Sequence, residues 1–299
     1  MKELKYIVLG LIATAVACSK VSTEEPVHTS PEEENSVPVY IASIAEPSEG
    51  FFSGEVPSSK SISNEFQFSF KNGDKIFVCP NPLGNTAIQY SLRPDSENPK
   101  KALFTGEKVL MNDGKWCAVY PSPLSNNSDA TAITLSFTGQ SQKRDNDAEH
   151  LSAFDYCWAD TDIKDSKGEF TLNHKVSWLK ITFTLTSSSS LEYSRKYKTI
   201  SVSADDGGIP QSITLNALTG TVSLNERSTL SLNLNEENGI QVDKGKSLTA
   251  FITIPSGDYT NLAVSTTSTD NDRTFSYSGN GKVSLAEGKY YSITLTEPQ

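Results

Sequence analysis

Short runs in which apolar and polar residues alternate recur along almost the whole chain, and this pattern limits the fold class more than any other feature. Residues 66–70 and 133–137 alternate in this way, and the longest run covers residues 178–185. Because successive side chains of a strand point to opposite faces of a sheet, alternation with period two is typical of half-buried β-strands. In the longest run it places Leu179 on one face and Trp178 on the other. The sequence therefore predicts an all-β protein built from many short strands.

The spacing of these runs indicates how the strands are grouped. They recur every ~10–20 residues and are separated by clusters of Gly, Asn and Asp, which is typical of β-sandwiches. Residues 187–190 are consecutive serines that interrupt the pattern, and similar runs resume after them. A chain of 299 residues is long enough for two domains of ~150 residues each. We therefore expect two tandem β-sandwich domains, at residues 37–187 and 188–299.

The N-terminus has the features of a secretory signal. Lys2 and Lys5 are followed by an apolar run over residues 6–17 and then by Cys18. The run is shorter than the ~20 apolar residues that a membrane-spanning helix needs. Its end, Ala-Val-Ala, fits the small-residue site of an ordinary signal peptidase, and the same residues with Cys18 resemble a bacterial lipobox. Both interpretations predict a cut before Cys18, and the second makes residues 1–17 the signal peptide of a lipoprotein.

Residues 18–36 are polar, acidic and poor in apolar side chains, which predicts a flexible tether. Cys18, at the first mature position, would carry the lipid as palmitate or similar acyl chains. Two or three acyl chains hold a protein on a membrane far more firmly than one. We therefore expect a protein that is anchored to a membrane through Cys18 and lifted off its surface by the tether.

The charge balance bears on the class of partner. Asp and Glu outnumber Lys and Arg by 36 to 26, and the net charge is −10. Binding to nucleic acid requires basic patches that displace counterions from the phosphates. This composition argues against a nucleic-acid partner.

Residues that carry enzyme chemistry are few. The histidines are His28, His150 and His174, and the motifs G-x-S-x-G and H-E-x-x-H are missing. Residues 279–282 lack the first glycine and the Ser or Thr of a phosphate-binding loop. Asp160 and Asp162 begin a loop without the spacing or the final Glu of a calcium site. We therefore expect a protein that is not an enzyme and that has no cofactor and no metal site.

Large aromatic side chains in strand-like runs are usually part of a core, although they can also stack on sugars. Trp116, Trp158 and Trp178 all lie in or beside such runs. We expect these side chains in the core.

Three cysteines remain once Cys18 is assigned to the lipid. They are Cys79, Cys117 and Cys157, and none of them forms a C-x-x-C motif. Cys79 and Cys117 each lie in an apolar, strand-like run. A disulfide between these two is one interpretation, and buried free thiols that act as small apolar side chains are the other.

Several short motifs follow one another in a definite order between residue 37 and the C-terminus. An aromatic strand leads into Gly-Asp-Lys-Ile at residues 73–76, and a strand over residues 116–120 closes on Pro121. Leu-Asn-His at residues 172–174 precedes the longest apolar strand, and Leu-Ala-Glu-Gly-Lys-Tyr-Tyr ends at Tyr291. In this order, and behind a lipobox cysteine, the sequence resembles the fimbrillin family, the lipoprotein subunits of the type V pili of Bacteroidetes.

The resemblance implies two transthyretin-like β-sandwich domains and a structural role. A member of this family is a subunit of a surface fimbrium, or pilus, that supports cell adhesion. Its partners are other fimbrial subunits, the outer membrane through the lipid anchor, and a host or bacterial surface ligand. Assembly in the family uses donor strand exchange, in which a protease removes the first strand of a subunit and a strand of another subunit fills the groove.

Applied to this chain, the resemblance implies one strand that is removed and one strand that is donated. The removable strand covers residues 37–45, and its groove residues would be Val37, Val39 and Ile41. The donated strand would be the last one, with Tyr291, Ile293 and Leu295 on one face.

The expected processing site departs from the family pattern. The family is cut after Arg, but this chain has no Arg before Arg93, and the loop over residues 56–61 offers Lys60 instead. If the first strand stays in place, the alternative is a surface lipoprotein that does not polymerise. Such a protein would be an anchor, a tip or a module that binds glycan or protein.

Overall fold

The computed structural model describes residues 39–50, 66, 68–81, 88–105, 111–122, 129–186, 194–236, 238–271 and 273–296. The prediction of an all-β protein is confirmed, because these residues form strands, their connections and a short 3-10 helix, η2 (Glu149–Ala153). Residues 38–299 form one compact unit. The predicted signal peptide, Cys18, the tether and Lys60 lie outside the described residues. Within the described part of the chain, no helix is long and apolar enough to cross a membrane.

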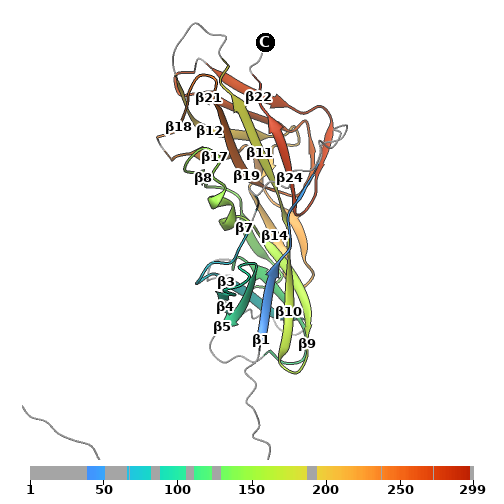
Figure 1. The fold of residues 1–299 in the computed structure, drawn as a ribbon. Helices are drawn as coiled ribbons and strands as arrows, with labels where there is room; N and C mark the ends of the chain where they lie inside the picture. The colour runs from blue at the N-terminus through green and yellow to red at the C-terminus, as the bar shows by residue number, and fades with distance from the viewer. Residues whose placement is uncertain are drawn as a thin grey trace, which may run out of the picture. The chain divides into compact units, whose positions relative to one another are not determined.

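Seven strands close into a barrel (Figure 1). They are β1 (Val39–Ile44), β3 (Lys75–Asn81), β4 (Ile88–Pro94), β5 (Lys101–Thr105), β6 (Gly114–Tyr120), β9 (Cys157–Ile163) and β10 (Lys167–His174). Their order is β1-β10-β9-β6-β3-β4-β5, and β5 pairs with β1 again. A closed barrel has no free sheet edge. A β-sandwich domain was predicted for this region, and its strands close into a barrel because β1 pairs on both of its sides.

The other strands form smaller sheets. A four-stranded sheet has the order β19-β11-β24-β2, with β2 (Ser48–Glu49), β11 (Val176–Thr184), β19 (Ser247–Pro255) and β24 (Lys289–Thr294). A six-stranded sheet has the order β22-β21-β12-β17-β8, with β18 paired to β12. Its strands are β8 (Gln140–Gln142), β12 (Arg195–Ser203), β17 (Leu230–Leu234), β18 (Ile240–Val242), β21 (Ala263–Ser268) and β22 (Thr274–Ser278).

Three small sheets complete the described strands. One has the order β15-β14-β7, with β7 (Ile133–Ser136), β14 (Ser212–Asn216) and β15 (Thr221–Leu224). The other two are pairs: β13 (Ile209–Pro210) with β16 (Arg227–Ser228), and β20 (Gly257–Thr260) with β23 (Lys282–Leu285).

Strand pairing crosses the boundary that the sequence suggests at residues 187 and 188. β11 lies before this point, and both of its neighbours, β19 and β24, lie after it. β7 and β8 also come before it and pair with β14 and β17. The serines at residues 187–190 fall between β11 and β12, and the sheets do not divide there. Both edges of β11 are paired with strands that come later in the chain, so sequence order and sheet membership differ.

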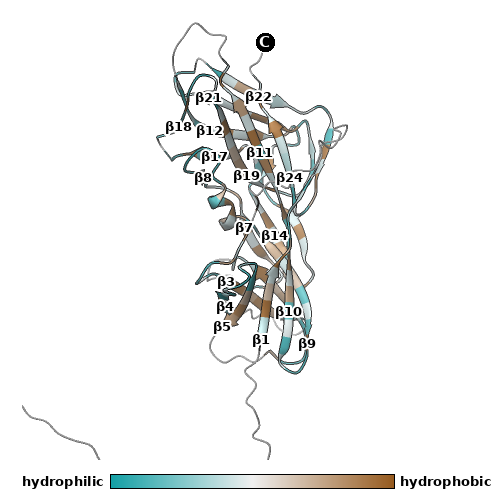
Figure 2. Cartoon of the chain, viewed as in Figure 1, coloured by the Kyte–Doolittle hydropathy of each residue, from teal (hydrophilic) through white to brown (hydrophobic). Residues whose placement is uncertain are grey.

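The apolar face of β11 lies in the core as predicted. Leu179, Ile181 and Phe183 are fully buried, and Figure 2 shows apolar residues along β11 and its neighbours β19 and β24. Trp178, predicted on the opposite face, is fully buried as well. The ring of Phe68 stacks on it, with 5.0 Å between the ring centroids. Phe68, which lies outside the sheet, therefore covers the second face at this end of β11.

Two glutamine side chains cover the outer edge of the four-stranded sheet. Gln140 donates to the carbonyl oxygen of Thr253 at 2.7 Å and accepts from the N–H of the same residue at 2.8 Å. Gln142 in the same way donates to the carbonyl oxygen of Thr249 and accepts from the N–H of Phe251, both at 2.9 Å. These amides take the place of a neighbouring strand beside β19. They protect an edge that would otherwise be open to strand addition.

We expect the substitution Gln140→Leu to lower the free energy of unfolding by about 1–3 kcal/mol for each backbone group that it leaves buried and unpaired. The groups concerned are the N–H and the carbonyl of Thr253 and the carbonyl of Phe137. Denaturant unfolding measures the loss. Ser141→Ala is the matched control, because within the described structure the buried hydroxyl of Ser141 has no hydrogen-bond partner. Equal stability of the two variants would contradict a role for Gln140 at this edge.

Candidate functional site

The candidate site is built around residues 39–50, here called the leading segment. Its first part is β1, which lies between β10, to which it is parallel, and β5, to which it is antiparallel. The side chains of Tyr40, Ala42 and Ile44 are buried. The hydroxyl of Tyr40 accepts a hydrogen bond from the backbone N–H of Met111 at 2.8 Å, so the polar end of this inward side chain is satisfied.

The buried face of β1 is not the one expected from the sequence. Val37, Val39 and Ile41 were expected in the groove, but the residues that fill the core have even numbers, and Ile41 is only half-buried. Val37 and the side chain of Val39 lie outside the described part. A one-residue change of register reverses the two faces of a strand, and only the pairing with β5 and β10 sets that register.

Beyond β1 the leading segment passes from the barrel to the four-stranded sheet. The N–H of Ala45 donates to the carbonyl of Leu172 at 2.9 Å, and the N–H of Ser48 donates to that of Gly288 at 3.0 Å. β2 then pairs in parallel with β24, at the edge of that sheet. The N–H of Gly50 extends this pairing to the carbonyl of Tyr290 at 2.7 Å. One short segment therefore completes the barrel and also adds a strand to a second sheet.

The end of the leading segment fits only a glycine. A Cβ atom at Gly50 would lie 2.4 Å from the ring of Tyr291. No real Cβ atom approaches a ring carbon so closely, so any side chain here would force Tyr291 or the segment to move.

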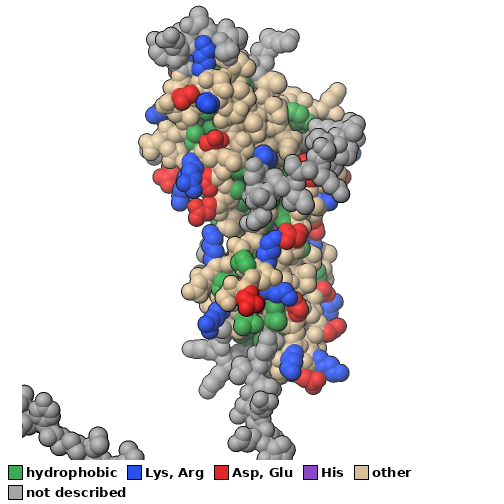
Figure 3. Space-filling model, in the orientation of Figure 1, with side chains coloured by type: hydrophobic (Ala, Val, Ile, Leu, Met, Phe, Trp, Pro, Cys, Tyr) green, Lys and Arg blue, Asp and Glu red, His purple; other side chains and the backbone are tan. Residues whose placement is uncertain are grey.

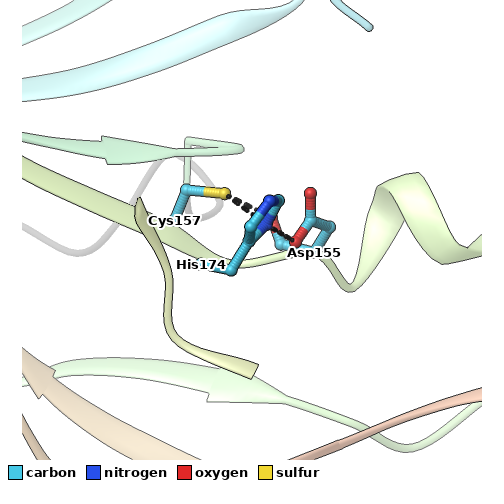
Figure 4. A group of neighbouring side chains, drawn as sticks. All are labelled: Asp155, Cys157 and His174. Carbon is cyan, nitrogen blue, oxygen red and sulfur yellow. Dashed lines mark hydrogen bonds and ion pairs between the residues drawn. The ribbon is translucent and has the colours of Figure 1, made fainter. Parts of the chain in front are cut away.

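A buried polar cluster lies where the leading segment passes between the sheets. In Figure 4 the ring of His174 lies between Asp155 and Cys157. Nδ1 of His174 is 2.6 Å from Oδ1 of Asp155 and 3.3 Å from the Cys157 sulfur. Nε2 of His174 is 2.9 Å from the carbonyl oxygen of Ala45 in the leading segment. Both ring nitrogens thus face oxygen acceptors, and the doubly protonated imidazolium donates to both of them.

The electrostatics agree with this assignment. Burial opposes charge on His174, but the nearby Asp155 carboxylate outweighs burial and raises the pKa of His174 above its ordinary value. Burial raises the pKa of the Cys157 thiol well above its ordinary value, so this thiol is neutral at pH 7. Oδ2 of Asp155 is buried and, within the described residues, has no hydrogen-bond partner. The His174 proton is therefore the main compensation for this carboxylate.

The cluster is arranged as a hydrogen-bond network and not as a catalytic triad. In a triad the nucleophile and the carboxylate bind opposite nitrogens of the histidine, whereas Cys157 and Asp155 both approach Nδ1. Their donor atoms also lie within 4.8 Å of one another, as metal ligands could. A structural zinc site uses four ligands, and among the described residues three side chains form this group. Its contact with Ala45 gives it a plain role, which is to hold the leading segment.

The predicted donor strand lies in the core of its own subunit. Tyr291, Ile293 and Leu295 are all buried, and β24 lies between β11 and β2. The side chains that were expected to reach into a neighbour fill this chain's own core instead. The alternation had identified their shared face correctly, but it could not tell which subunit that face would fill.

The predicted cysteine pair lies at directly opposite positions of β3 and β6. Cys79 and Cys117 are register partners, and both are buried free thiols in the structure. The interpretation as small buried side chains describes this state. Whether they become oxidised stays a prediction.

The tryptophans offer little surface for stacking on sugars. Trp116 and Trp178 are buried. Trp158 is half-buried, donates to the carbonyl of Ala217 at 2.7 Å and has the Lys175 ammonium 5.4 Å from its ring centre. Figure 3 shows acidic and basic side chains intermingled on the face that it draws, so this face presents no broad area of a single charge.

Sequence reasoning missed Asp155, Gly50 and the carbonyl of Ala45. His174 was noted as one of three histidines and as part of a motif, and Asp155 lies in a different segment of the chain. No local pattern joins them, because the contact arises from the pairing of β9 with β10. The one feature of the sequence that could have pointed to this cluster was the presence of polar residues beside apolar strands.

The sequence model of the fimbrillin-like family matches residues 64–299. The chain belongs to the fimbrillin-like family. No curated protein matches the sequence. Among solved structures, a candidate cell adhesion protein from Bacteroides uniformis shares 17% identity with a TM-score of 0.52, and the match covers 87% of this chain and 96% of that one. A second candidate cell adhesion protein, from Bacteroides ovatus, shares 16% identity with a TM-score of 0.51, and the match covers 87% of this chain and 95% of that one.

These two similarities show a shared fold. Membership of the fimbrillin-like family, in turn, supports a role as a fimbrial subunit at the cell surface, with other fimbrial subunits as partners.

Proposed function

We propose that this fimbrillin-like chain is a structural subunit of a surface fimbrium that supports cell adhesion. It is exported as a lipoprotein through Cys18 and assembles by strand exchange at the site of the leading segment. The observation that carries the proposal is the position of β1, which closes the barrel between β5 and β10.

Loss of the leading segment would leave a strongly binding groove. β5 and β10 would each have an unpaired edge, and the spaces left by Tyr40, Ala42 and Ile44 would be open to water. Exposed edges and apolar sockets favour the addition of a new strand, in which the main chain supplies affinity and alternate side chains supply specificity. The groove would select a strand with a large, a small and a large inward residue, and with glycine at the position of Gly50.

The proposal assigns the accepting site to this chain and leaves the donated strand to a neighbouring subunit. The last strand, with Tyr291, Ile293 and Leu295, could be donated only if it first left its pairing with β11 and β2. Donation of β24 would therefore compete with the stability of the subunit itself.

The test is the N-terminus of the native protein in two fractions, sheared surface filaments and the outer membrane. We expect chains in the filaments to begin near Ser61 because a cut at Lys60 frees the leading segment. Lys60→Gln should block the cut and keep the chain out of the filaments, and Lys20→Gln is the matched control in the predicted tether. Filaments built from chains that still begin at an acylated Cys18 would refute strand exchange. An acylated chain found only in the membrane would identify a non-polymerising lipoprotein.

A further inference from the structure

The barrel has a seam directly opposite the leading strand. Around the ring, β10, β9 and β6 lie on one side of β1, and β5, β4 and β3 lie on the other. β3 and β6 meet opposite β1, and their register partners include Cys79 and Cys117. If β1 leaves, the pairing of β3 with β6 is what still joins the two halves. This seam is where a covalent link would have the most effect.

The geometry of the pair suits a disulfide. Residues directly opposite each other in antiparallel strands have Cα atoms about 4.5–5.5 Å apart, within the range that a disulfide spans. Cys157 is out of reach, because Cys117 lies opposite Asp160 and Tyr120 lies opposite Cys157. Three residues along a strand separate them by about 10 Å. The Cys157 sulfur is also in contact with His174 at 3.3 Å.

The two thiols differ in reactivity. A hydrogen bond from Cys79 lowers the pKa of Cys117, and the side-chain amide of Asn81 contributes in the same direction. The same bond to Cys117 raises the pKa of Cys79. The hydrogen bond between the two sulfurs favours the thiolate of Cys117 over that of Cys79, and a thiolate is the nucleophile in disulfide exchange.

We infer that Cys79 and Cys117 are a modification site at which a disulfide-carrying oxidant forms an intrachain disulfide between β3 and β6. The Cys117 thiolate attacks one sulfur of the oxidant, forms a mixed disulfide and releases the first thiol of the oxidant. The Cys79 sulfur then attacks the Cys117 sulfur and releases the second thiol. The pair loses two electrons and two protons, and the oxidant is reduced to two thiols. The crosslink joins the two halves of the barrel.

Burial decides when this reaction takes place. Both cysteines are fully buried, and the carbonyl of Leu218, at the turn between β14 and β15, accepts from Asn81 at 2.8 Å and from the Cys117 thiol at 3.7 Å. This turn covers the pair. Oxidation is therefore fast during folding and slow once the barrel has closed. Any contribution of the disulfide to filament assembly rests on the proposed function. The formation of the disulfide does not depend on that function.

Peptide mapping without reduction tests the inference. Thiols are trapped in acid and alkylated under denaturing conditions, both in the full chain taken from the cell envelope and in the reduced chain refolded with oxidised and reduced glutathione. We expect the peptides with Cys79 and Cys117 to be joined and Cys157 to be alkylated. Cys157→Ala should keep the crosslink and Cys79→Ala should lose it. In the crosslinked chain, added reductant should lower the denaturant concentration at the unfolding midpoint.

Separate alkylation of Cys79 and Cys117 in both preparations would overturn the inference, and so would a crosslink to Cys157 or Cys18. These results are independent of strand exchange. If chains that begin near Ser61 carry no crosslink, the disulfide inference is wrong and strand exchange stands. If the chain is crosslinked but never enters filaments, strand exchange is wrong and the disulfide inference stands.

Discussion

Truncation of the chain before Tyr290 is expected to abolish cooperative folding, and not only assembly. β24 lies between β11 and β2, so its loss leaves a long strand without its parallel neighbour. It also removes four buried apolar side chains from the core: Tyr290, Tyr291, Ile293 and Leu295. Truncation of one buried Leu or Ile to Ala typically costs about 2–5 kcal/mol, which is a large part of the stability of a whole domain.

Single substitutions in β24 should change stability less than the truncation does, and by amounts that depend on burial. Ile293→Ala should lower the free energy of unfolding by about 2–5 kcal/mol. Ser292→Ala, on the exposed face of the same strand, should change it by less than about 0.5 kcal/mol. Denaturant unfolding followed by tryptophan fluorescence measures both. If the truncated chain unfolds cooperatively with the stability of the full chain, β24 is dispensable, and its assignment as the donated strand is restored.

Replacement of His174 by Ala is expected to lower the free energy of unfolding by about 3–5 kcal/mol, because it leaves a buried carboxylate without its partner. The side chains of His174 and Asp155 are each only 1% exposed. The variant also removes the donor to the carbonyl of Ala45, so the leading segment should become more accessible. Hydrogen exchange at residues 39–50 reports this local effect separately from global stability.

The His174 pairing also has a defined pH dependence. The folded-state pKa of His174 is raised above its unfolded value, which is about 6.5. The stabilisation is therefore fully present below about pH 6.5 and is lost as the pH rises through the higher folded-state pKa. Asp155→Asn removes the charge that holds the proton and should flatten this dependence. The measurement is the free energy of unfolding at a series of pH values above 6 for the wild type and this variant.

His150 supplies a control of opposite sign. Burial lowers its pKa in the folded state, so its contribution is present above about pH 6.5 and is lost as the pH falls. His150→Gln should leave the loss of stability above pH 6.5 intact. If the dependence above pH 6.5 were the same in the wild type and in Asp155→Asn, another group would be its source.

Local alternation predicted the strands well because it reports only which side chains share a face. The buried side of β11, with Leu179, Ile181 and Phe183, was read correctly. Alternation made no prediction at β1, where the resemblance named Val39 and Ile41, and pairing with β5 and β10 buries Tyr40, Ala42 and Ile44. The aromatic ring of Tyr40 fills the core, and its hydroxyl has a hydrogen-bond partner there. A pattern of hydrophobicity alone does not predict that this side chain is buried.

The all-β class and the family could be predicted from the amino-acid sequence alone. Each of these follows from local pattern or from the order of motifs along the chain. The tertiary structure decided the closure of the barrel by β1, the place of β24 in the core of its own chain, and the meeting of Asp155 with His174 at the leading segment. These features depend on contacts between residues far apart in sequence. Such contacts are set by the register and sheet order that bury the most apolar surface with every backbone group paired.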